Sequence, residues 1–158
     1  MLKRTIKSPK IYFRDTGLAA YLTRWLTPET LANGAMSGAF FENFVIGEIL
    51  KSYANCGRDY RYCMSYYRGR DKKPIQSTRE NGTRETRENE IDLIIEENGI
   101  LYPIEIKQTA KATVDMTSAF TVLDRLPDKK RGTGAVVCQC PQPGMLRENI
   151  LAVPVWYV

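Results

Sequence analysis

Asn98-Gly99 stands between two runs rich in isoleucine and leucine, residues 90–97 and 100–107. An Asn-Gly pair between alternating apolar residues predicts a two-residue β-hairpin, because a type I′ turn requires positive φ at both central positions. Such a turn pairs the two residues that flank it, and this pairing fixes every later pair along the hairpin. The stretch therefore predicts both a strand pair and its register.

The register places Asp92 directly across from Glu105, and the two-residue period of a strand puts Lys107 on the same face. The opposite face is expected to pack on a core and carries Ile91, Leu93, Ile95, Tyr102, Ile104 and Ile106. Two carboxylates a strand width apart can hold one hard divalent cation, and an ammonium can orient a water or a phosphate. A solvated hairpin with Glu90–Lys107 and Glu105–Lys107 ion pairs is the structural alternative.

The spacing Asp-x12-Glu-x-Lys resembles the active-site motif of the PD-(D/E)-x-K nuclease superfamily, with Ile91 where many members have proline. The resemblance implies catalytic roles for Asp92, Glu105 and Lys107. Asp92 and Glu105 would ligate Mg²⁺ or Mn²⁺ together with the Ile106 carbonyl oxygen, and Lys107 would orient the attacking water.

A long helix is predicted from Ser37 to Asn55, and its apolar residues cover so much of the surface that burial on nearly all sides is expected. Glu42 and Glu48 interrupt this apolar surface. A buried carboxylate needs a lysine, a backbone donor or a metal. Glu42, or in second place Glu48, is therefore expected either to join the acidic groups of the hairpin or to form a buried ion pair.

The rest of the pattern predicts an α/β (α+β) fold with a central mixed sheet. The expected order is helix, strand, hairpin, helix, strand, which resembles the restriction-endonuclease-like core of the same superfamily. Asp15 is expected to cap a helix over 17–22, and Pro154 places the last strand at an edge or a bulge. Strands are expected at 10–14, 60–68, 135–140 and 149–158, and a second amphipathic helix at 115–126.

Further motifs resemble the domain of unknown function that follows an AAA-type ATPase module in many prokaryotic proteins. They are Ser8–Leu22, Phe41–Lys51, Tyr66–Arg68, Glu90–Leu93 and Tyr102–Lys107. This resemblance implies that residues 1–36 are an appendage or a linker from an ATPase module missing from this chain, and that 37–158 form the nuclease-like core. The chain has no G-x4-G-K-[ST] motif, so we expect it to bind no nucleotide through a P-loop.

The formal net charge of +5 and the pI of about 9.0 suit an anionic partner, and DNA or another nucleic acid is the first expectation. The charged stretch 69–89 departs from the short connection usual in the family and is expected to be a mobile excursion. A solvated loop whose charges compensate one another is the alternative. Residues expected to contact phosphates are Arg68, Arg70, Lys72, Lys73, Gln108, Lys111, Lys129, Lys130 and Arg131.

The chain has no histidine, which excludes Ser-His-Asp and Cys-His catalysis. Its four cysteines lack Cys-x2-Cys spacing, so reduced thiols are expected. No run is long and apolar enough for a membrane span or a signal peptide, and a cytoplasmic location is expected. Two functions stay open: a metal-dependent nuclease-like domain that acts on or binds DNA and is coupled to an AAA-type ATPase, or a non-catalytic module that binds nucleic acid or protein.

Overall fold

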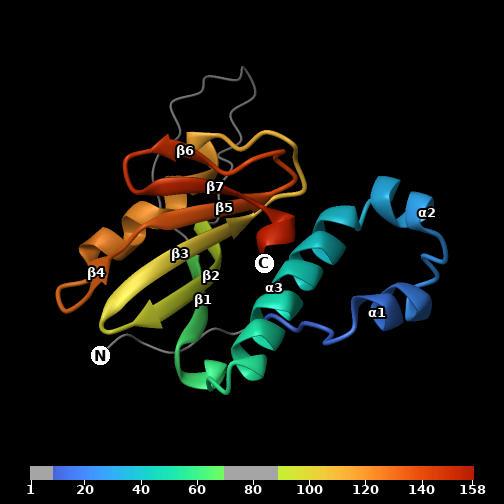
Figure 1. Cartoon of the computed structure of the whole chain (residues 1–158), viewed down its shortest axis with the longest axis horizontal. Coiled ribbons are helices and arrows are strands. Elements are labelled where there is room, and N and C mark those ends of the chain that lie inside the picture. Colours follow the sequence, from blue (N-terminus) through green and yellow to red (C-terminus); the bar gives the residue numbers. More distant parts are fainter. Residues whose placement is uncertain (1–8, 70–88) are drawn as a thin grey trace, which may run out of the picture.

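A mixed β-sheet forms the centre of the protein, and the longest helix crosses one of its faces (Figure 1). The computed structural model describes residues 9–69 and 89–158. The predicted excursion, with Arg70, Lys72 and Lys73, therefore lies outside the described residues apart from its two ends. Within the described residues, no helix is long and apolar enough to cross a bilayer.

Three α-helices precede the sheet: α1 (Thr16–Leu22), α2 (Pro28–Asn33) and α3 (Ser37–Asn55). The described residues also form three 3₁₀ helices: η1 (Tyr60–Tyr62) before the first strand, η2 (Val114–Arg125) between the third and fourth strands, and η3 (Val155–Tyr157) after the last strand. The strands are β1 (Met64–Gly69), β2 (Asn89–Glu97), β3 (Ile100–Ile106), β4 (Lys130–Arg131), β5 (Gly134–Cys138), β6 (Gly144–Arg147) and β7 (Ile150–Pro154). The predicted order of helix, strand, hairpin, helix and strand is confirmed.

In the described part of the chain, seven strands form one sheet in the order β1-β2-β3-β5-β7-β6, with β4 paired to β3 outside this path. The pairs β1–β2, β2–β3 and β6–β7 are antiparallel, whereas β3–β4, β3–β5 and β5–β7 are parallel. The predicted mixed sheet is thus confirmed. Parallel neighbours need a crossover connection, and between β3 and β5 this connection contains η2.

The predicted hairpin is present, with φ of 53° at Asn98 and 78° at Gly99. Pairing runs in the predicted register from Glu97–Ile100 to Leu93–Ile104. β2 is irregular just beyond that point, where Asp92 and Leu93 together lie opposite the single residue of β1 between Ser65 and Tyr67. A bulge of this kind locally disrupts the ladder and redirects side chains.

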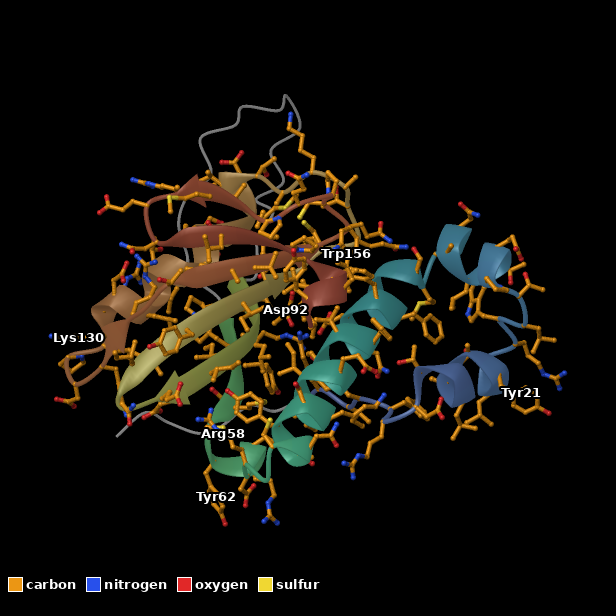
Figure 2. The ribbon with its side chains drawn as sticks, in the orientation of Figure 1. Tyr21, Arg58, Tyr62, Asp92, Lys130 and Trp156 are labelled. Carbon is orange, nitrogen blue, oxygen red and sulfur yellow. The ribbon has the colours of Figure 1, made fainter. Side chains whose placement is uncertain are left out.

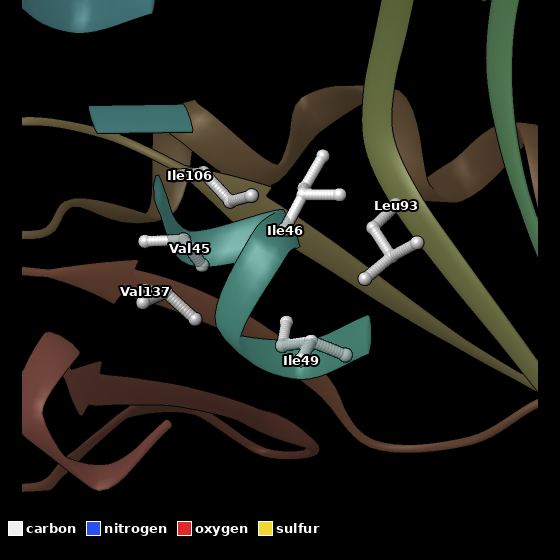
Figure 3. Close-up of a cluster of buried hydrophobic side chains, with 6 residues drawn as sticks. All are labelled: Val45, Ile46, Ile49, Leu93, Ile106 and Val137. Atoms are coloured by element: carbon white, nitrogen blue, oxygen red, sulfur yellow. The ribbon is translucent and has the colours of Figure 1, made fainter. Parts of the chain in front are cut away.

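Clusters of buried hydrophobic residues cover both faces of the sheet. Leu93 and Ile106 pack against α3 in a cluster completed by Val45, Ile46, Ile49 and Val137 (Figure 3). Ile94 and Leu101 pack against Phe120 of η2 on the other face. Ile91 belongs to this second cluster, so its predicted place beside Leu93 was wrong. The bulge explains the difference, because an extra residue between Ile91 and Ile94 changes the face on which Ile91 lies.

Several peripheral predictions were also wrong. Residues 10–14 form no strand, and the 60–68 strand begins only at Met64, after η1. The helix predicted at 115–126 is present in this position, as the 3₁₀ helix η2 rather than an α-helix. β7 lies inside the sheet because β6, which was not predicted, pairs beyond it. Pro154 is tolerated as the last residue of β7, where the strand ends.

The expectation that α3 is buried on nearly all sides was wrong as well. Its buried residues are Asn43, Val45, Ile46, Gly47 and Ile49, whereas Phe44 is 43% exposed. α3 packs on the sheet with one side and approaches α1 and α2 with another, which leaves a further strip in solvent (Figure 1). The placement of Glu42 and Glu48 around this helix therefore decides what each can contact.

Candidate functional site

Asp92 lies where β2 and β3 cease to pair, near the centre of the molecule (Figure 2). Its side chain is buried, with 5% of the residue exposed, and its Oδ2 accepts the Ile106 amide hydrogen at 2.9 Å. The Asp92 carboxylate thus satisfies a backbone donor of β3. A buried carboxylate in this position needs further positive partners.

Glu105 and Lys107 complete the predicted trio. The Lys107 Nζ lies 2.6 Å from Glu105 Oε1 and 3.8 Å from Asp92 Oδ2, so both acids reach one ammonium. The ion pair between Glu105 and Lys107 is one that the solvated alternative also predicts. That alternative expects both acids to be exposed to solvent, whereas Asp92 and Glu105 are only 5% and 6% exposed. Lys107, by contrast, is exposed and reaches the solvent from this buried pair.

The second oxygen of Glu105, Oε2, is buried and has no hydrogen-bond donor among the residues that the structure describes. Burial and the neighbouring charge of Asp92 raise the pKa of Glu105 to about 7, against the opposing hydrogen bond from Lys107. A buried acceptor left without a donor costs free energy. This oxygen is therefore the point in the cluster where a cation would be most favourable.

Lys10 is a site residue that sequence reasoning missed. Its Nζ lies 2.6 Å from Glu90 Oε1, 2.8 Å from Glu42 Oε1 and 3.2 Å from Asp92 Oδ1. The side chain is only 11% exposed. Burial acts to lower the pKa of Lys10, but the hydrogen bonds to Glu42 and Glu90 and the charge of Asp92 outweigh it and raise this pKa. Lys10 is therefore firmly protonated.

Asn43 fixes the segment that carries Lys10. Its Oδ1 accepts the Phe13 amide hydrogen at 2.7 Å, and its Nδ2 donates to the Phe13 carbonyl at 2.9 Å and to Thr16 Oγ1 at 2.9 Å. The buried Asn43 side chain thus pairs with Phe13 as a neighbouring strand would. This explains how residues 10–13 are held against the fold without joining the sheet.

Tyr12 lies on the same side of that segment as Lys10 and donates its hydroxyl hydrogen to Glu42 Oε1 at 2.6 Å. Burial, and then the hydrogen bond to Glu42, raise the pKa of Tyr12, so the phenol stays neutral. Ile11 and Phe13 alternate with these residues and are exposed. The polar side of Lys10-Ile-Tyr-Phe faces inward. In the sequence this appears as an alternation of polar and apolar residues over 10–13, which does not indicate which residues the polar side contacts.

The structure brings Glu42, and not Glu48, to the acidic groups of the hairpin. Glu48 instead lies 2.6 Å from Lys51 on the surface of α3. Glu90 also joins the cluster, where it contacts Lys10 and, at 3.0 Å, Arg68. Burial acts to raise the pKa of Glu90, but Lys10 and then Arg68 outweigh it and lower this pKa. Over residues 9–69 and 89–158, no three His, Cys, Asp or Glu side chains form a group suited to a metal.

The residues predicted to contact phosphates are spread over several places. Arg68, Lys129 and Arg131 form ion pairs with Glu90, Glu96 and Asp124. Lys130 lies at the outer end of the sheet, well apart from Asp92 (Figure 2). Gln108 and Lys111 follow Lys107 in the chain, and Lys111 is exposed.

The hairpin trio lies within the part of the chain that is similar to a known family. Residues 82–158 match the family described as Domain of unknown function (DUF4143). The match covers just under half of the chain and includes Asp92, Glu105 and Lys107, but not Lys10 or Glu42. Comparisons of this chain with curated proteins and with solved structures found no match. The expectation of a domain of unknown function is thus supported over this region.

Proposed function

We propose that this chain is a metal-dependent nuclease-like domain that acts on or binds DNA. The observation that carries the proposal is the buried Glu105 oxygen, which has no donor among the described residues and lies in a cluster with Asp92 and Lys107. A buried carboxylate oxygen of this kind is suited to a hard divalent cation.

The donor set fits Mg²⁺ or Mn²⁺. Glu105 Oε2 and Asp92 Oδ2 would hold the ion with the Ile106 carbonyl oxygen, since a carboxylate oxygen that accepts one hydrogen bond keeps a second lone pair. A bound ion would lower the pKa of a water molecule and offset the negative charge of a phosphodiester. Lys107 is exposed enough to reach a phosphate oxygen and would orient the attacking water and stabilise developing charge.

The architecture supports a restriction-endonuclease-like core as part of this proposal. An acid-bearing hairpin is followed by a crossover and a parallel strand, and the helix before the sheet supplies Glu42. Lys107 and Lys111 lie on the chain that leaves β3, where a phosphate backbone could approach. Gln108 lies between them. We infer that DNA would contact the protein on this side.

The second candidate is a non-catalytic module that binds nucleic acid or a protein partner. The observation in its favour is the Lys10 ammonium, which already compensates Asp92 and Glu42. A cluster of carboxylates whose negative charge is offset by a lysine of the same protein can be stable without a metal ion. In either case we propose that the domain works with an AAA-type ATPase module, on the strength of the sequence resemblance.

The two candidates are separated by a cleavage assay on single-stranded and double-stranded DNA with Mg²⁺ or Mn²⁺. Lys107→Ala is expected to lower the rate by about 100-fold or more, because it removes a charge aimed at the reacting groups. Lys51→Ala removes a surface lysine of similar exposure and should leave the rate unchanged. Equal rates for wild type and Lys107→Ala exclude the catalytic assignment. DNA binding without cleavage in both would favour the binding module.

A further inference from the structure

Two neighbouring aromatic side chains of η3 lie in solvent where β7 ends (Figure 2). Trp156 is 58% exposed and Tyr157 is 66% exposed, although tryptophan is highly buried on average. The residues on either side, Val155 and Val158, pack against the hydrophobic cluster between α3 and the sheet. A 3₁₀ helix repeats every three residues, so the two valines share one side and the aromatic rings lie on the others. The buried valines therefore anchor η3 and hold both rings outward.

η3 lies at the edge of the sheet where Lys107 leaves β3. β3, β5 and β7 are parallel, with Ile106 paired to Val137 and Val137 paired to Val153. Their carboxyl ends therefore meet at one edge, and η3 lies there beside α3 (Figure 1). Neighbouring strands are about 4.8 Å apart, so the backbones at Lys107 and at the end of β7 are about 10 Å apart. Open α/β sheets bind their ligands outside this edge.

The chain segments that leave these three strands carry positive charge. Residues 107–113, 139–143 and 155–158 contain two lysines, Lys107 and Lys111, and no aspartate or glutamate. Lys111 is exposed, and 45% of the Lys107 side chain is exposed although its ammonium also contacts the buried Glu105. These segments therefore suit a negatively charged partner with apolar, flat groups.

An unpaired nucleic-acid strand has this chemistry. Its bases stack on aromatic side chains while basic residues hold its phosphates, and such stacking tolerates any base sequence. In a duplex the base faces are covered by the neighbouring base pairs, so an exposed ring has less to contact. A strand of about three nucleotides covers 10 Å at about 3.4 Å each, so one strand can reach both Lys107 and Trp156.

We propose that Trp156, with Tyr157 beside it, is a stacking platform for an unpaired base, and that this site takes single-stranded DNA in preference to an intact duplex. The inference deepens the proposed function and rests on it for the choice of DNA as partner. Lys107 and Lys111 hold phosphates of the same strand, which brings its backbone past the Glu105 side of the acidic cluster. Trp156 decides which form of DNA binds and takes no part in bond cleavage.

The test is the affinity for a short labelled oligothymidylate, measured by fluorescence anisotropy in low-salt buffer with EDTA, where metal-dependent cleavage is absent. Trp156→Ala is expected to bind at least about fivefold more weakly than wild type, and Trp156→Phe to lose less, because a phenyl ring still stacks. Tyr62→Ala removes an exposed aromatic ring from η1 and should leave the affinity unchanged. The strand should also quench the tryptophan fluorescence of wild type but not that of Trp156→Phe, which retains only Trp25.

Two further ligands separate stacking from phosphate binding. An abasic strand of the same length keeps the phosphates and lacks the bases, so it should bind wild type and Trp156→Ala equally weakly. The matching duplex should bind wild type more weakly than the single strand does. Equal affinity of wild type for the strand and the abasic strand would overturn the inference, and so would a preference for the duplex.

Unchanged binding of the strand to folded Trp156→Ala would overturn it as well. If circular dichroism shows that Trp156→Ala is unfolded, Trp156→Leu, which keeps an apolar side chain without a ring, decides in its place. If strand binding depends on Trp156 while Lys107→Ala cleaves as fast as wild type, the inference stands and the catalytic assignment fails. If cleavage depends on Lys107 while binding does not depend on Trp156, the proposed function stands and this inference fails.

Discussion

The acidic cluster has two sides that differ in how well their charges are compensated. On one side, Glu42, Glu90 and Asp92 each place an oxygen against Lys10. On the other side, Glu105 is paired through Oε1 with Lys107, while Oε2 has no donor in the described part of the chain. Uncompensated burial costs stability, and proteins keep such strain mainly where it serves a function. We therefore expect the Lys10 side to stabilise the fold, and the Glu105 side to be the one on which the proposed function depends.

The largest effect is expected for Asp92, the residue that both sides share. Asp92→Ala leaves the Ile106 amide without its acceptor and removes a counter-charge from two lysines. Breaking a buried ion pair from one side should lower the free energy of unfolding by about 3–5 kcal/mol. Urea denaturation measures this change. Asp124→Ala, which removes an exposed partner of Arg131, serves as the control and should cost at most about 1 kcal/mol.

A smaller loss is expected for Asn43→Ala, which keeps every charge of the cluster. It removes the three hydrogen bonds that fix Phe13 and Thr16, at a cost of about 1–3 kcal/mol. The control is Asn33→Ala, on the surface of α2. Urea denaturation of both variants measures the change, and an equal loss in the two would contradict the role of Asn43 in fixing this segment.

The sequence was sufficient to predict the hairpin and the trio on it, because turn chemistry and strand period are local. Asn98-Gly99 determines the register as far as Leu93–Ile104, and Asp92, Glu105 and Lys107 lie just beyond the end of this regular pairing. The bulge at Asp92 and Leu93 was not predictable in this way, since it depends on pairing with β1. Lys10 was missed for the same reason. Its partners are distant in the chain, and Asn43 takes over a backbone role that no local pattern indicates.

A gain in stability is expected on the Glu105 side. Glu105→Gln removes a buried charge that burial and Asp92 disfavour, while the amide oxygen can still accept from Lys107. The free energy of unfolding in metal-free buffer at pH 8 should rise by about 1–2 kcal/mol. Mn²⁺ binding and any cleavage should be lost in the same variant. A loss of stability comparable to that of Asp92→Ala would show that the two sides do not differ as proposed.

The pH dependence of stability should show the same contrast. Burial and Asp92 raise the pKa of Glu105 to about 7, so between pH 5 and pH 7 the folded chain binds a proton that the unfolded chain has released. The contribution of Glu105 to stability therefore falls as pH rises through this window, and metal affinity rises because the proton must leave. Asp92, Lys107 and Glu90 are the neighbouring groups whose charges act on Glu105. Denaturation of wild type and Glu105→Gln at several pH values should show this slope in wild type alone.

The smallest effect is expected at Glu48, and it tests why Glu42 and Glu48 differ although both interrupt the apolar surface of α3. Glu48 contacts Lys51 one helical turn away, where solvent screens the pair, so Glu48→Gln should change the free energy of unfolding by at most about 0.5 kcal/mol. Glu42 accepts from Lys10 and Tyr12 across the fold, so Glu42→Gln should weaken both contacts and cost more. Thermal melts of the two variants give the comparison directly. Equal losses would mean that the contact between Glu42 and Lys10 stabilises the fold no more than a surface ion pair does. The proposed difference between the two sides of the cluster would then be wrong.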